Sequence, residues 1–261
     1  MMTDKPKMHI ASCSFGKDSI ATILLALEHN EPLDKVVFAE VMFDNNRNIS
    51  GESPEHIEWI RNVAVPKLEA LGIKVDIVRS KDDYVKEFYK VRGSKTKNPD
   101  RVGKHQGFLI AGFCKLNSVG KVKPIRDYIK AYAKDFDIVQ YVGIAVDEPI
   151  RLQRLKEGRV SLLAKYNYTE KMAMTLCEKY GLVSPIYQTG TRGGCWFCPN
   201  ASVKGYSILR KKNPHLWEEL KILDKVENKV SIRFKRDLTL SDLERKMDDK
   251  ELNDSLQTKL F

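Results

Sequence analysis

The residues near the start of the chain that are best suited to chemistry are Ser-Phe-Gly-Lys-Asp-Ser, at positions 14–19. They lie between an apolar run at 8–11, typical of a buried strand, and a helix-like run at 20–27. A strand that passes directly into a helix leaves the N–H groups of the first helical turn free to bind an anion. The stretch therefore predicts a phosphate-binding turn.

The side chains of this turn suit a nucleotide phosphate. Gly16 allows the backbone to approach the phosphate closely, and Lys17 supplies a positive charge. Asp18 can cap the helix or help to place Mg²⁺ among the phosphate oxygens. Ser14 and Ser19 add hydroxyl groups. The Gly-x-x-x-x-Gly-Lys-Ser/Thr loop is absent from the sequence, which excludes a kinase-type nucleotide site.

The second set of candidate residues consists of cysteines. Cys195 and Cys198 are spaced so that both thiolates can reach one metal centre. Cys114 and Cys177 lie in two other segments, and four thiolates from three segments can converge if the later helical part folds back onto the strand ends. Cys198-Pro199 also resembles the cysteine-proline ending of ferredoxin cluster runs. The cysteines therefore predict a metal centre.

Other interpretations of these cysteines stay open at this point. Four thiolates also suit structural zinc. The Cys195 and Cys198 pair alone can act as a redox dithiol, although no thioredoxin-like pattern surrounds it. Cys177 can instead be a small buried hydrophobic residue on a helix, and Cys13, on the first strand, is expected in the core.

Strands and helices must alternate to position these residues. An alternation of this kind predicts an α/β fold with a doubly wound, mainly parallel sheet, in which ligands bind beyond the carboxyl ends of the strands. The predicted strands are 8–11, 35–43, 73–78 and 138–146. The predicted helices between them are 18–30, 54–71, 82–89 and 124–134.

The strand pattern stops near residue 146, and a turn-rich segment at 184–200 is surrounded by helical patterns. We therefore predict two domains, a nucleotide-binding α/β domain over residues 1–160 and a helical, cysteine-containing module with a charged tail over 161–261. The helical patterns of the second part are 168–180, 202–212 and 215–227.

Positive charge is concentrated in the middle of the chain. Residues 79–134 hold fifteen Lys and Arg against five Asp and Glu, a surplus that equals the net charge of +10 for all 261 residues. A basic region of this kind predicts a polyanionic partner such as nucleic acid. A solvated lysine-rich surface is the alternative.

The sequence shows no pattern of a signal peptide at its start and no apolar stretch long enough to span a bilayer. We therefore expect a cytoplasmic protein without a membrane partner. In a reducing compartment the five cysteines are expected to be thiols. The oligomeric state is left open.

Residues 14–19 resemble the PP-loop, usually Ser-Gly-Gly-x-Asp-Ser, of the ATP pyrophosphatase superfamily, in particular its phosphoadenosine phosphosulfate (PAPS) reductase-like family. Phe15 departs from the first glycine of that pattern. The resemblance extends over roughly the first 200 residues and implies an adenine nucleotide alpha hydrolase-like fold. In that superfamily the loop holds the pyrophosphate of ATP while the α-phosphate is attacked, which gives Lys17 and Asp18 catalytic roles.

Three further segments carry the resemblance. Asp44 matches the aspartate of the family's Asp-Thr-Gly, although Asn45-Asn46 does not match the rest, and it implies contact with adenosine. Residues 113–129 are similar to the Cys-x-x-x-x-Lys-x-x-Pro block that contains Cys114. Residues 143–151 resemble Gly-Ile-Arg-x-x-Glu-Ser-x-Arg and place Arg151 among the nucleotide ligands, but Ala145 replaces the first arginine.

The cysteine pattern resembles iron-sulfur members of the family, including enzymes of DNA phosphorothioation, in which four cysteines hold a 4Fe-4S cluster. The resemblance implies that ATP and Mg²⁺ adenylate a substrate, and that sulfur relayed through a cluster on the four cysteines then displaces AMP. Nucleic acid bound at 79–134 is the expected acceptor. A sulfur donor such as a cysteine desulfurase is a further expected partner.

Two alternative functions remain. A sulfonucleotide reductase that reduces PAPS or APS resembles the chain through its loop, but it needs a cysteine near the C-terminus, and no cysteine follows Cys198. A non-catalytic, zinc-stabilised module that binds nucleotide or nucleic acid is the other alternative.

Overall fold

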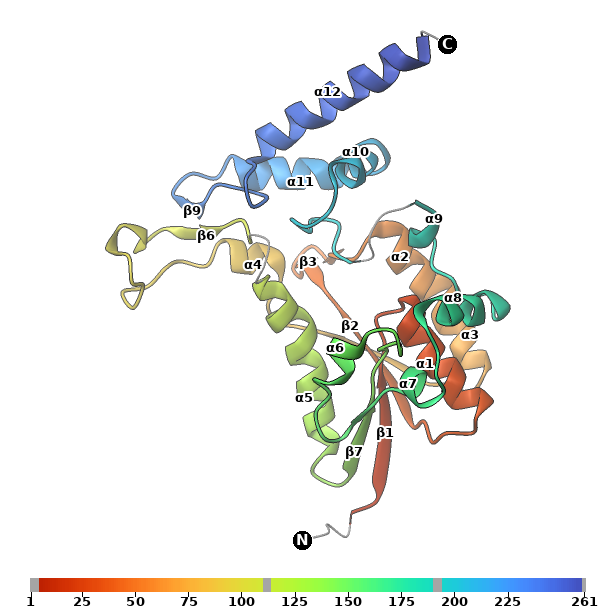
Figure 1. Ribbon diagram of the computed structural model, residues 1–261. Helices are drawn as coiled ribbons and strands as arrows, with labels where there is room; N and C mark the ends of the chain where they lie inside the picture. Colours follow the sequence, from red (N-terminus) through yellow and green to blue (C-terminus); the bar gives the residue numbers. More distant parts are fainter. Residues whose placement is uncertain (1–4, 110–113, 190–193, 260–261) are drawn as a thin grey trace.

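A five-stranded sheet lies at the centre of the first part of the molecule (Figure 1). The computed structural model describes residues 5–109, 114–189 and 194–259. The strands all run parallel, in the spatial order β5-β2-β1-β7-β8. They are β1 (Lys7–Ser12), β2 (Lys35–Glu40), β5 (Val75–Arg79), β7 (Asp137–Tyr141) and β8 (Arg159–Val160). The parallel α/β fold predicted from the sequence is confirmed.

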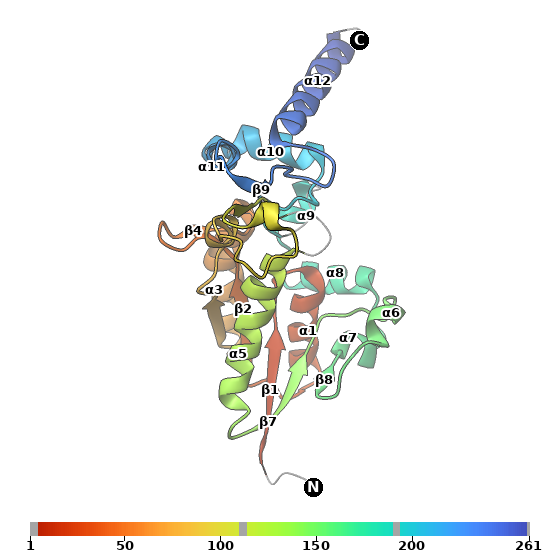
Figure 2. The ribbon, with the colours of Figure 1, turned by 90° about the vertical axis from the view of Figure 1, so that its left-hand side faces the viewer.

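Helices cover both faces of this sheet, so the fold is doubly wound (Figures 1 and 2). On one face α1 (Lys17–Glu28) packs against α7 (Leu162–Lys165) and α8 (Glu170–Lys179). On the other face α5 (Lys123–Tyr132) packs against β2 and β5. Residues 19–26 of α1 are all buried, because this helix lies between the sheet and α8.

The predicted helix 54–71 is one continuous helical run with a wider turn in its middle. It consists of α2 (Pro54–Trp59), the π-helical turn η1 (Ile60–Ala64) and α3 (Val65–Ala70). Pro54 stands in the first turn of α2, where a missing N–H costs no hydrogen bond. Pro66 stands in the first turn of α3, next to the widened turn.

The order of the strands creates a crevice at one end of the sheet. The chain leaves β1 for β2 on one side and returns to pair β7 on the other side of β1. At such a reversal the connections leave the carboxyl ends of the two strands in opposite directions, and ligands bind there in doubly wound sheets. Residues 14–19 follow β1 at this point.

A second, aromatic-rich core lies beyond the carboxyl ends of the strands. It combines the hairpin β3 (Met42–Asp44) and β4 (Ile49–Ser50) and the helix α4 (Tyr84–Phe88) with helices from the last third of the chain (Figure 1). Those helices are α10 (Val203–Lys212), α11 (Pro214–Asp224) and α12 (Leu240–Lys259). The remaining elements are η2 (Pro99–Arg101), β6 (His105–Gly107), η3 (Asn117–Val122), α6 (Pro149–Leu152), α9 (Ile186–Thr189) and β9 (Lys229–Ser231).

The observed strands differ from the predicted ones in two ways. The stretch 35–43 is divided, because β2 ends at Glu40 while β3 turns away to pair with β4. Strand structure also does not stop at residue 146, since β8 extends the main sheet and β9 pairs with β6. The strands β8 and β9 are two and three residues long, which is too short to show an alternating pattern in the sequence.

The two hydrophobic cores do not coincide with the two predicted domains. The boundary at residue 160 stays a prediction. Residues 162–182 contribute Leu162, Leu176 and Cys177 to the core around the main sheet. The second core takes Phe43 and Tyr84 from the first half of the chain. Each core is therefore built from segments on both sides of residue 160.

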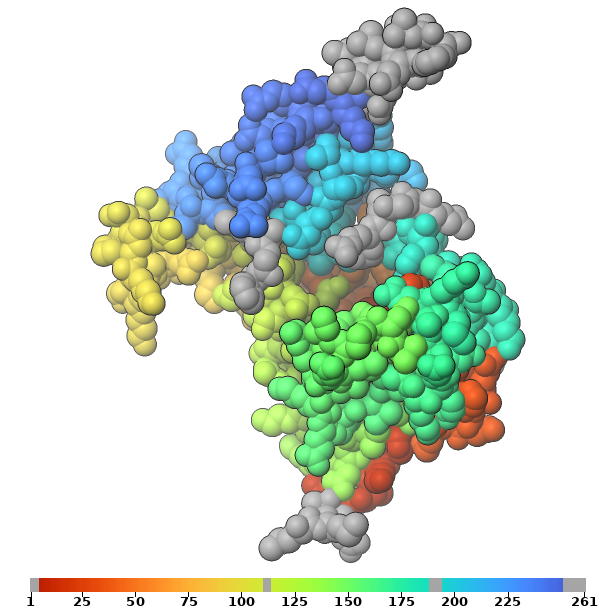
Figure 3. Space-filling view, in the orientation of Figure 1, coloured from red at the N-terminus to blue at the C-terminus, as the bar shows by residue number. Residues whose placement is uncertain are grey.

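On the face seen in Figure 3, a recess separates the main sheet and its helices from the helices of the second core. N-terminal residues, in red, are visible inside this recess. Within the described residues, no helix has the length and apolar character needed to cross a membrane.

Candidate functional site

The loop between β1 and α1 is held by hydrogen bonds among its own residues. Gly16 is the N-cap of α1, with φ −77° and ψ 160°. The Ser19 hydroxyl donates to the Gly16 carbonyl oxygen (2.9 Å) and accepts from the Ser14 N–H (3.2 Å). Three of the predicted phosphate ligands therefore form one closed turn at a helix N-terminus, where the helix dipole favours an anion.

Phe15 adopts a backbone conformation that normally favours glycine. Its φ of +57° lies in the left-handed region, which costs a residue with a side chain about 1–2 kcal/mol. The ring is buried and packs edge-on against Phe38 (centroids 5.3 Å apart) and Trp59 (6.4 Å). Burial of a phenylalanine contributes roughly 2–3 kcal/mol, which offsets the strain. The loop therefore keeps its conformation without the glycine.

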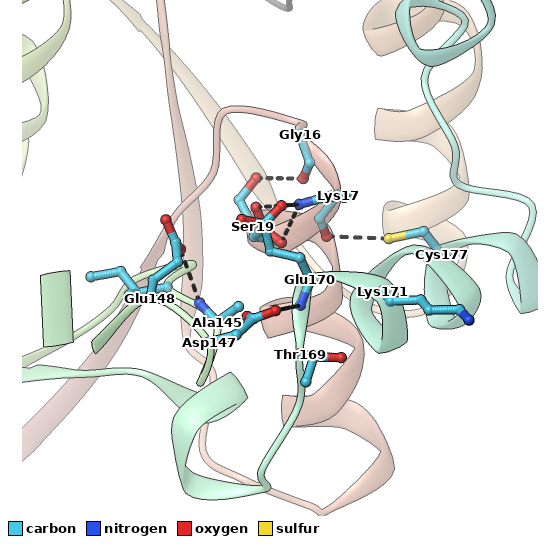
Figure 4. A network of polar contacts seen from close by, with 12 residues as sticks. Gly16, Lys17, Ser19, Ala145, Asp147, Glu148, Thr169, Glu170, Lys171 and Cys177 are labelled. Carbon is cyan, nitrogen blue, oxygen red and sulfur yellow. Dashed lines mark hydrogen bonds and ion pairs between the residues drawn. The ribbon is translucent and has the colours of Figure 1, made fainter. Parts of the chain in front are cut away.

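Lys17 is held between two carboxylates beside this turn (Figure 4). Its Nζ lies 2.9 Å from Asp18 Oδ1 and 2.7 Å from Glu170 Oε2. Burial by itself lowers the pKa of Lys17, but the hydrogen bonds and charges of Glu170 and Asp18 together raise it. Lys17 therefore stays cationic at the place where phosphate charge is expected.

Asp18 stands among charges of both signs. Burial raises the pKa of its carboxyl group, Lys17 lowers it, and the negative charges of Glu170 and Glu148 raise it further, with a net rise. Three carboxylates thus gather beside one lysine at the start of α1. A divalent cation placed among phosphate oxygens would offset this surplus of negative charge.

The loop that follows β7 lies directly against the first turn of α1. A Cβ atom on Gly143 would come within 2.7 Å of the Asp18 carbonyl carbon and the Ser19 nitrogen, a distance that side chains do not tolerate. Glycine at this position therefore lets the two loops meet. This contact brings the segment 143–151 to the same edge of the sheet as the phosphate-binding turn.

Arg151 lies on α6 in this segment, with its side chain 56 % exposed. Its guanidinium pairs with Glu148 Oε1, while Glu148 Oε2 accepts the Ala145 N–H (3.2 Å). Arg151 thus lies at the edge of the sheet that carries residues 14–19, and its charge is paired with Glu148. Its role as a nucleotide ligand stays a prediction.

Asp44 holds the turn between β3 and β4. Its carboxylate accepts hydrogen bonds from the Asn46 N–H (2.9 Å) and from Arg47 Nε (2.7 Å), and Arg47 also pairs with Glu219 of α11 (2.7 Å). Burial raises the pKa of Asp44, but these partners lower it more, with a net fall. Asp44 therefore has a structural role here, and contact with adenosine stays a prediction.

Three residues that the sequence did not single out complete the surroundings of the turn. The Tyr187 hydroxyl accepts the Lys17 N–H (2.9 Å). His56 donates from Nε2 to the Ser14 carbonyl oxygen (3.2 Å), and its Nδ1 lies 2.8 Å from the Ser184 hydroxyl, which can donate to it. Burial lowers the pKa of His56, which favours this neutral tautomer. None of these residues belongs to a local motif, so no sequence pattern could have identified them.

Three of the four predicted metal ligands share a site around Tyr84. Cys114 and Cys195 pack against the second core, which contains Tyr84, and a negative charge on any of the three sulfurs would raise the pKa of Tyr84. The Cys198 N–H donates to the Cys195 carbonyl oxygen (3.0 Å), which forms the tight turn expected of the Cys-x-x-Cys pair. We call Cys114, Cys195, Cys198 and Tyr84 the thiol site.

Cys177 does not lie at the thiol site. It is buried on α8, and its thiol donates to the Lys17 carbonyl oxygen (3.2 Å), as Figure 4 shows. Burial raises the pKa of Cys177 to about 12. The structure therefore does not bring the four predicted ligands together, and Cys177 occupies the position of a small buried residue beneath the phosphate-binding turn.

A buried ion pair adjoins the thiol site. Glu52 is 3 % exposed, and its Oε1 lies 3.4 Å from Lys121 Nζ. Burial and the charge of Glu52 raise the pKa of Cys195, whereas Lys121 lowers it, with a net rise. Lys121 is not the lysine that precedes Pro124 in the segment 113–129. That residue is Lys123, which pairs with the exposed Asp127 (3.4 Å).

The residues of the thiol site fit a thiolate-bound metal or cluster by their chemistry. Within the described ranges, no group of three or more His, Cys, Asp or Glu side chains is already arranged to hold a metal ion. The Tyr84 hydroxyl, however, is buried: its oxygen faces the Leu109 N–H, and its own proton has no acceptor among the described residues, which costs about 1–3 kcal/mol. A thiolate or sulfide acceptor would satisfy it. The rings of Phe43, Trp196 and Phe197 pack beside it and exclude water.

Residues 52–56 connect the phosphate-binding turn with the thiol site. Glu52 pairs its backbone with Cys195 in an antiparallel bridge, and His56, one helical turn later, hydrogen-bonds to Ser14. The charges of Glu52 and Lys121 both act on His56. One short segment at the start of α2 therefore contacts both candidate sites.

The basic middle of the sequence separates into paired and projecting cations. Arg79 and Lys86 form ion pairs with Glu40 (2.8 Å) and Asp82 (2.7 Å). The segment 90–106 projects from the body of the protein (Figure 1) and, with Lys115, lines an open cavity of about 790 Å³. The cations around that cavity are Lys90, Arg92, Lys95, Lys97, Arg101 and Lys115. Of these, Lys90 and Lys115 also form ion pairs with Glu87 (3.7 and 2.6 Å).

No family model and no curated protein matches this chain. A solved structure that matches is the U34-tRNA thiolase NcsA from Methanococcus maripaludis with its 4Fe-4S cluster, which is 19% identical. The match covers 87% of this chain and 76% of the thiolase chain, with a TM-score of 0.39. A likeness at this level carries no conclusion about function.

Proposed function

We propose that this chain is a PP-loop ATP pyrophosphatase that adenylates a nucleic-acid acceptor, so that sulfur can then replace an oxygen atom. The observation that carries the proposal is the closed turn of residues 14–19 at the strand-order reversal, with Lys17 cationic beside the free end of α1. The phosphates of ATP bind at this turn, and the adenosine lies toward Asp44. Arg151 and a Mg²⁺ ion near Asp18 complete the nucleotide site.

The chemistry proceeds in two displacements. An oxygen of the acceptor attacks the α-phosphorus of ATP, the new oxygen–phosphorus bond forms, and the bond to pyrophosphate breaks. Lys17 and the N–H groups of α1 offset the negative charge that develops on the phosphate oxygens. Sulfur at the oxidation level of sulfide then attacks the atom that carries the adenylated oxygen, and AMP leaves with that oxygen. No oxidant or reductant is consumed.

Cys114, Cys195 and Cys198 would hold a 4Fe-4S cluster, or zinc in the alternative. A cluster would supply a soft metal site at which inorganic sulfide can be kept near the acceptor. Tyr84 would donate a hydrogen bond to a sulfur atom there. Cys177, included among the ligands on sequence grounds, is left out of the proposed set because its thiol faces the Lys17 carbonyl oxygen.

Nucleic acid is the proposed acceptor because of the projecting segment 90–106. Its cations lie on an open surface rather than in a closed pocket, and a row of exposed Lys and Arg binds a phosphate backbone largely by counterion release. Affinity should therefore fall steeply with salt concentration.

The test is the release of AMP and pyrophosphate from ATP in the presence of tRNA, single-stranded DNA or duplex DNA. Lys17→Ala is expected to lower the rate by about 10²–10³-fold, the effect typical of removing one group that stabilises transition-state charge. Lys171→Ala is the matched control, because Lys171 is exposed on α8 and points away from the turn (Figure 4). Equal inactivity of wild type and Lys17→Ala with every acceptor would contradict the proposal.

A further inference from the structure

A cavity of about 250 Å³ lies between the start of α2 and α10, next to the thiol site. Cys195 and Trp196 form part of its wall, so a ligand in the cavity lies beside one of the proposed cluster ligands. The phosphate-binding turn contributes no residue to it. The cavity is therefore separate from the proposed ATP site.

The described wall of the cavity offers no charge partner to an anionic ligand. Among the described residues that line it there is no Lys, Arg or His, and the one charged side chain is the carboxylate of Glu55. Glu55 is paired with Lys212, whose Nζ lies 3.6 Å from Glu55 Oε1 and which stands outside the lining. A neutral occupant therefore fits these residues better than a phosphate or sulfate.

The composition of the wall, two aromatic residues with amide groups beside them, suits a heterocyclic base. The rings of Trp196 and Tyr206 are fixed by hydrogen bonds to the carbonyl oxygens of Ser50 (2.9 Å) and Cys198 (2.6 Å). Apolar side chains from α10 and the amides of Asn200 and Asn213 complete the wall. A combination of apolar surface and a few amide groups is typical of sites that bind bases by stacking and edge hydrogen bonds.

Gly205 keeps the cavity open. Glycine inside a helix costs about 0.5–1 kcal/mol relative to alanine, and neither its backbone nor its packing requires it here. A Cβ on Gly205 would be 3.4 Å from Ser202 Oγ, an ordinary contact. The space left by the missing side chain is part of the cavity instead.

We propose that this cavity receives one unpaired nucleobase of the acceptor. The inference rests on the proposed function and sharpens it, because it makes the base, rather than a backbone phosphate, the part of the nucleic acid held beside the thiol site. The phosphates that flank the base remain outside, where Lys204 of α10 is exposed.

The test compares two fluorescein-labelled 12-mers of equal charge, a mixed-sequence single-stranded DNA and an abasic strand, by fluorescence anisotropy without ATP. Wild type is expected to bind the base-containing strand about tenfold more tightly, the effect of one stacked base. Gly205→Leu fills the cavity and should abolish this preference while leaving the affinity for the abasic strand unchanged. Gly205→Ala should retain most of the preference.

Lys204→Leu is the control for a bulky apolar side chain on α10 outside the cavity. It should weaken binding of both strands by the same factor, since it removes a charge that acts on phosphates. If thermal unfolding shows that Gly205→Leu is misfolded, Ile208→Trp is used in its place, because Ile208 lines the cavity from the same helix.

The proposal is overturned if wild type binds the two strands equally, if it binds neither at low salt, or if a folded cavity-filling variant keeps the preference. The readout is independent of ATP cleavage. A preference for the base-containing strand without pyrophosphate release would therefore refute the proposed function but support the base-binding cavity. Pyrophosphate release without that preference would refute only the base-binding cavity.

Discussion

The phosphate-binding turn and the thiol site differ in how the chain assembles them. The turn is made by six consecutive residues whose hydrogen bonds close within the segment 14–19. The thiol site takes Tyr84, Cys114 and the Cys195 turn from segments far apart in the sequence. The hydrogen bonds that close the first are therefore local, although Phe38 and Trp59 pack against its Phe15, while the second exists only once two cores have packed against each other.

The two sites also differ in how their polar groups are satisfied before any ligand binds. Lys17 has two carboxylate partners, and its N–H group bonds to Tyr187. The proton of the buried Tyr84 hydroxyl has no acceptor within the part of the chain that the structure describes. A ligand at the turn must therefore exchange existing contacts, whereas a ligand at the thiol site supplies a missing one. Substitutions at both sites can test this contrast.

Metal content gives the largest expected difference. After anaerobic purification, wild type should carry iron and sulfide, with a broad absorption band near 400 nm expected of a cluster, and Cys195→Ala should lose both. Cys177→Ala should keep wild-type metal content, because that thiol bonds to Lys17 rather than facing the thiol site. Loss of metal in Cys177→Ala, with the fold intact by circular dichroism, would restore the four-cysteine site.

Replacement of Phe15 tests whether burial offsets the strain of the turn. Phe15→Ala should destabilise the protein by about 3–5 kcal/mol through the loss of a buried ring. Phe15→Gly removes the same ring but suits φ +57°, so it should be less destabilising than alanine by about 1 kcal/mol. Urea unfolding measures both. Equal stability of the two variants would show that the left-handed backbone is not maintained.

Tyr84→Phe tests whether the Tyr84 hydroxyl donates a hydrogen bond to a bound metal group. In metal-free protein the change removes an orphaned hydroxyl, so stability should stay equal or rise by up to about 1 kcal/mol. In metal-loaded protein it removes a donor to sulfur and should lower stability by a similar amount. The check is thermal unfolding of both forms of both proteins, and a change of the same sign in both forms would mean that Tyr84 does not contact the bound group.

Asp18→Asn has the smallest expected effect on stability. The pKa of Asp18 is raised above its usual 3.8 in the folded protein, mainly by burial, so the charged carboxylate carries a cost at pH values above its folded pKa. At pH 7 the neutral asparagine should therefore be more stable, by less than about 1 kcal/mol. The gain should shrink as the pH falls toward 3.8. Lower stability of Asp18→Asn at pH 7 in urea would show that the pair with Lys17 outweighs burial.

Local chemistry made much of the fold and the turn predictable. Alternating strands and helices identified the parallel sheet, since each element buries its apolar residues with a period that the sequence displays. The turn at 14–19 followed from the residue types alone, because its hydrogen bonds lie between close neighbours. The Cys195 and Cys198 turn was predictable for the same reason.

The partners of these groups were not predictable in the same way. Cys177 and Cys114 have the same chemistry in the sequence, and only the packing of α8 against α1 places one beneath Lys17 rather than at the thiol site. Asp44 was expected near a nucleotide, but the turn into β4 occupies its carboxylate.

The sequence by itself determined the alternation of strands and helices, the turn at 14–19 and the spacing of Cys195 and Cys198, because each is recorded in residues a few positions apart. Tertiary structure alone decided that Glu170 and Tyr187 meet Lys17, that Tyr84 shares a core with Cys114 and Cys195, and that a largely apolar cavity opens beside Cys195. Those contacts join segments separated by long stretches of chain. Their formation depends on how the two cores pack, and no local pattern records that packing.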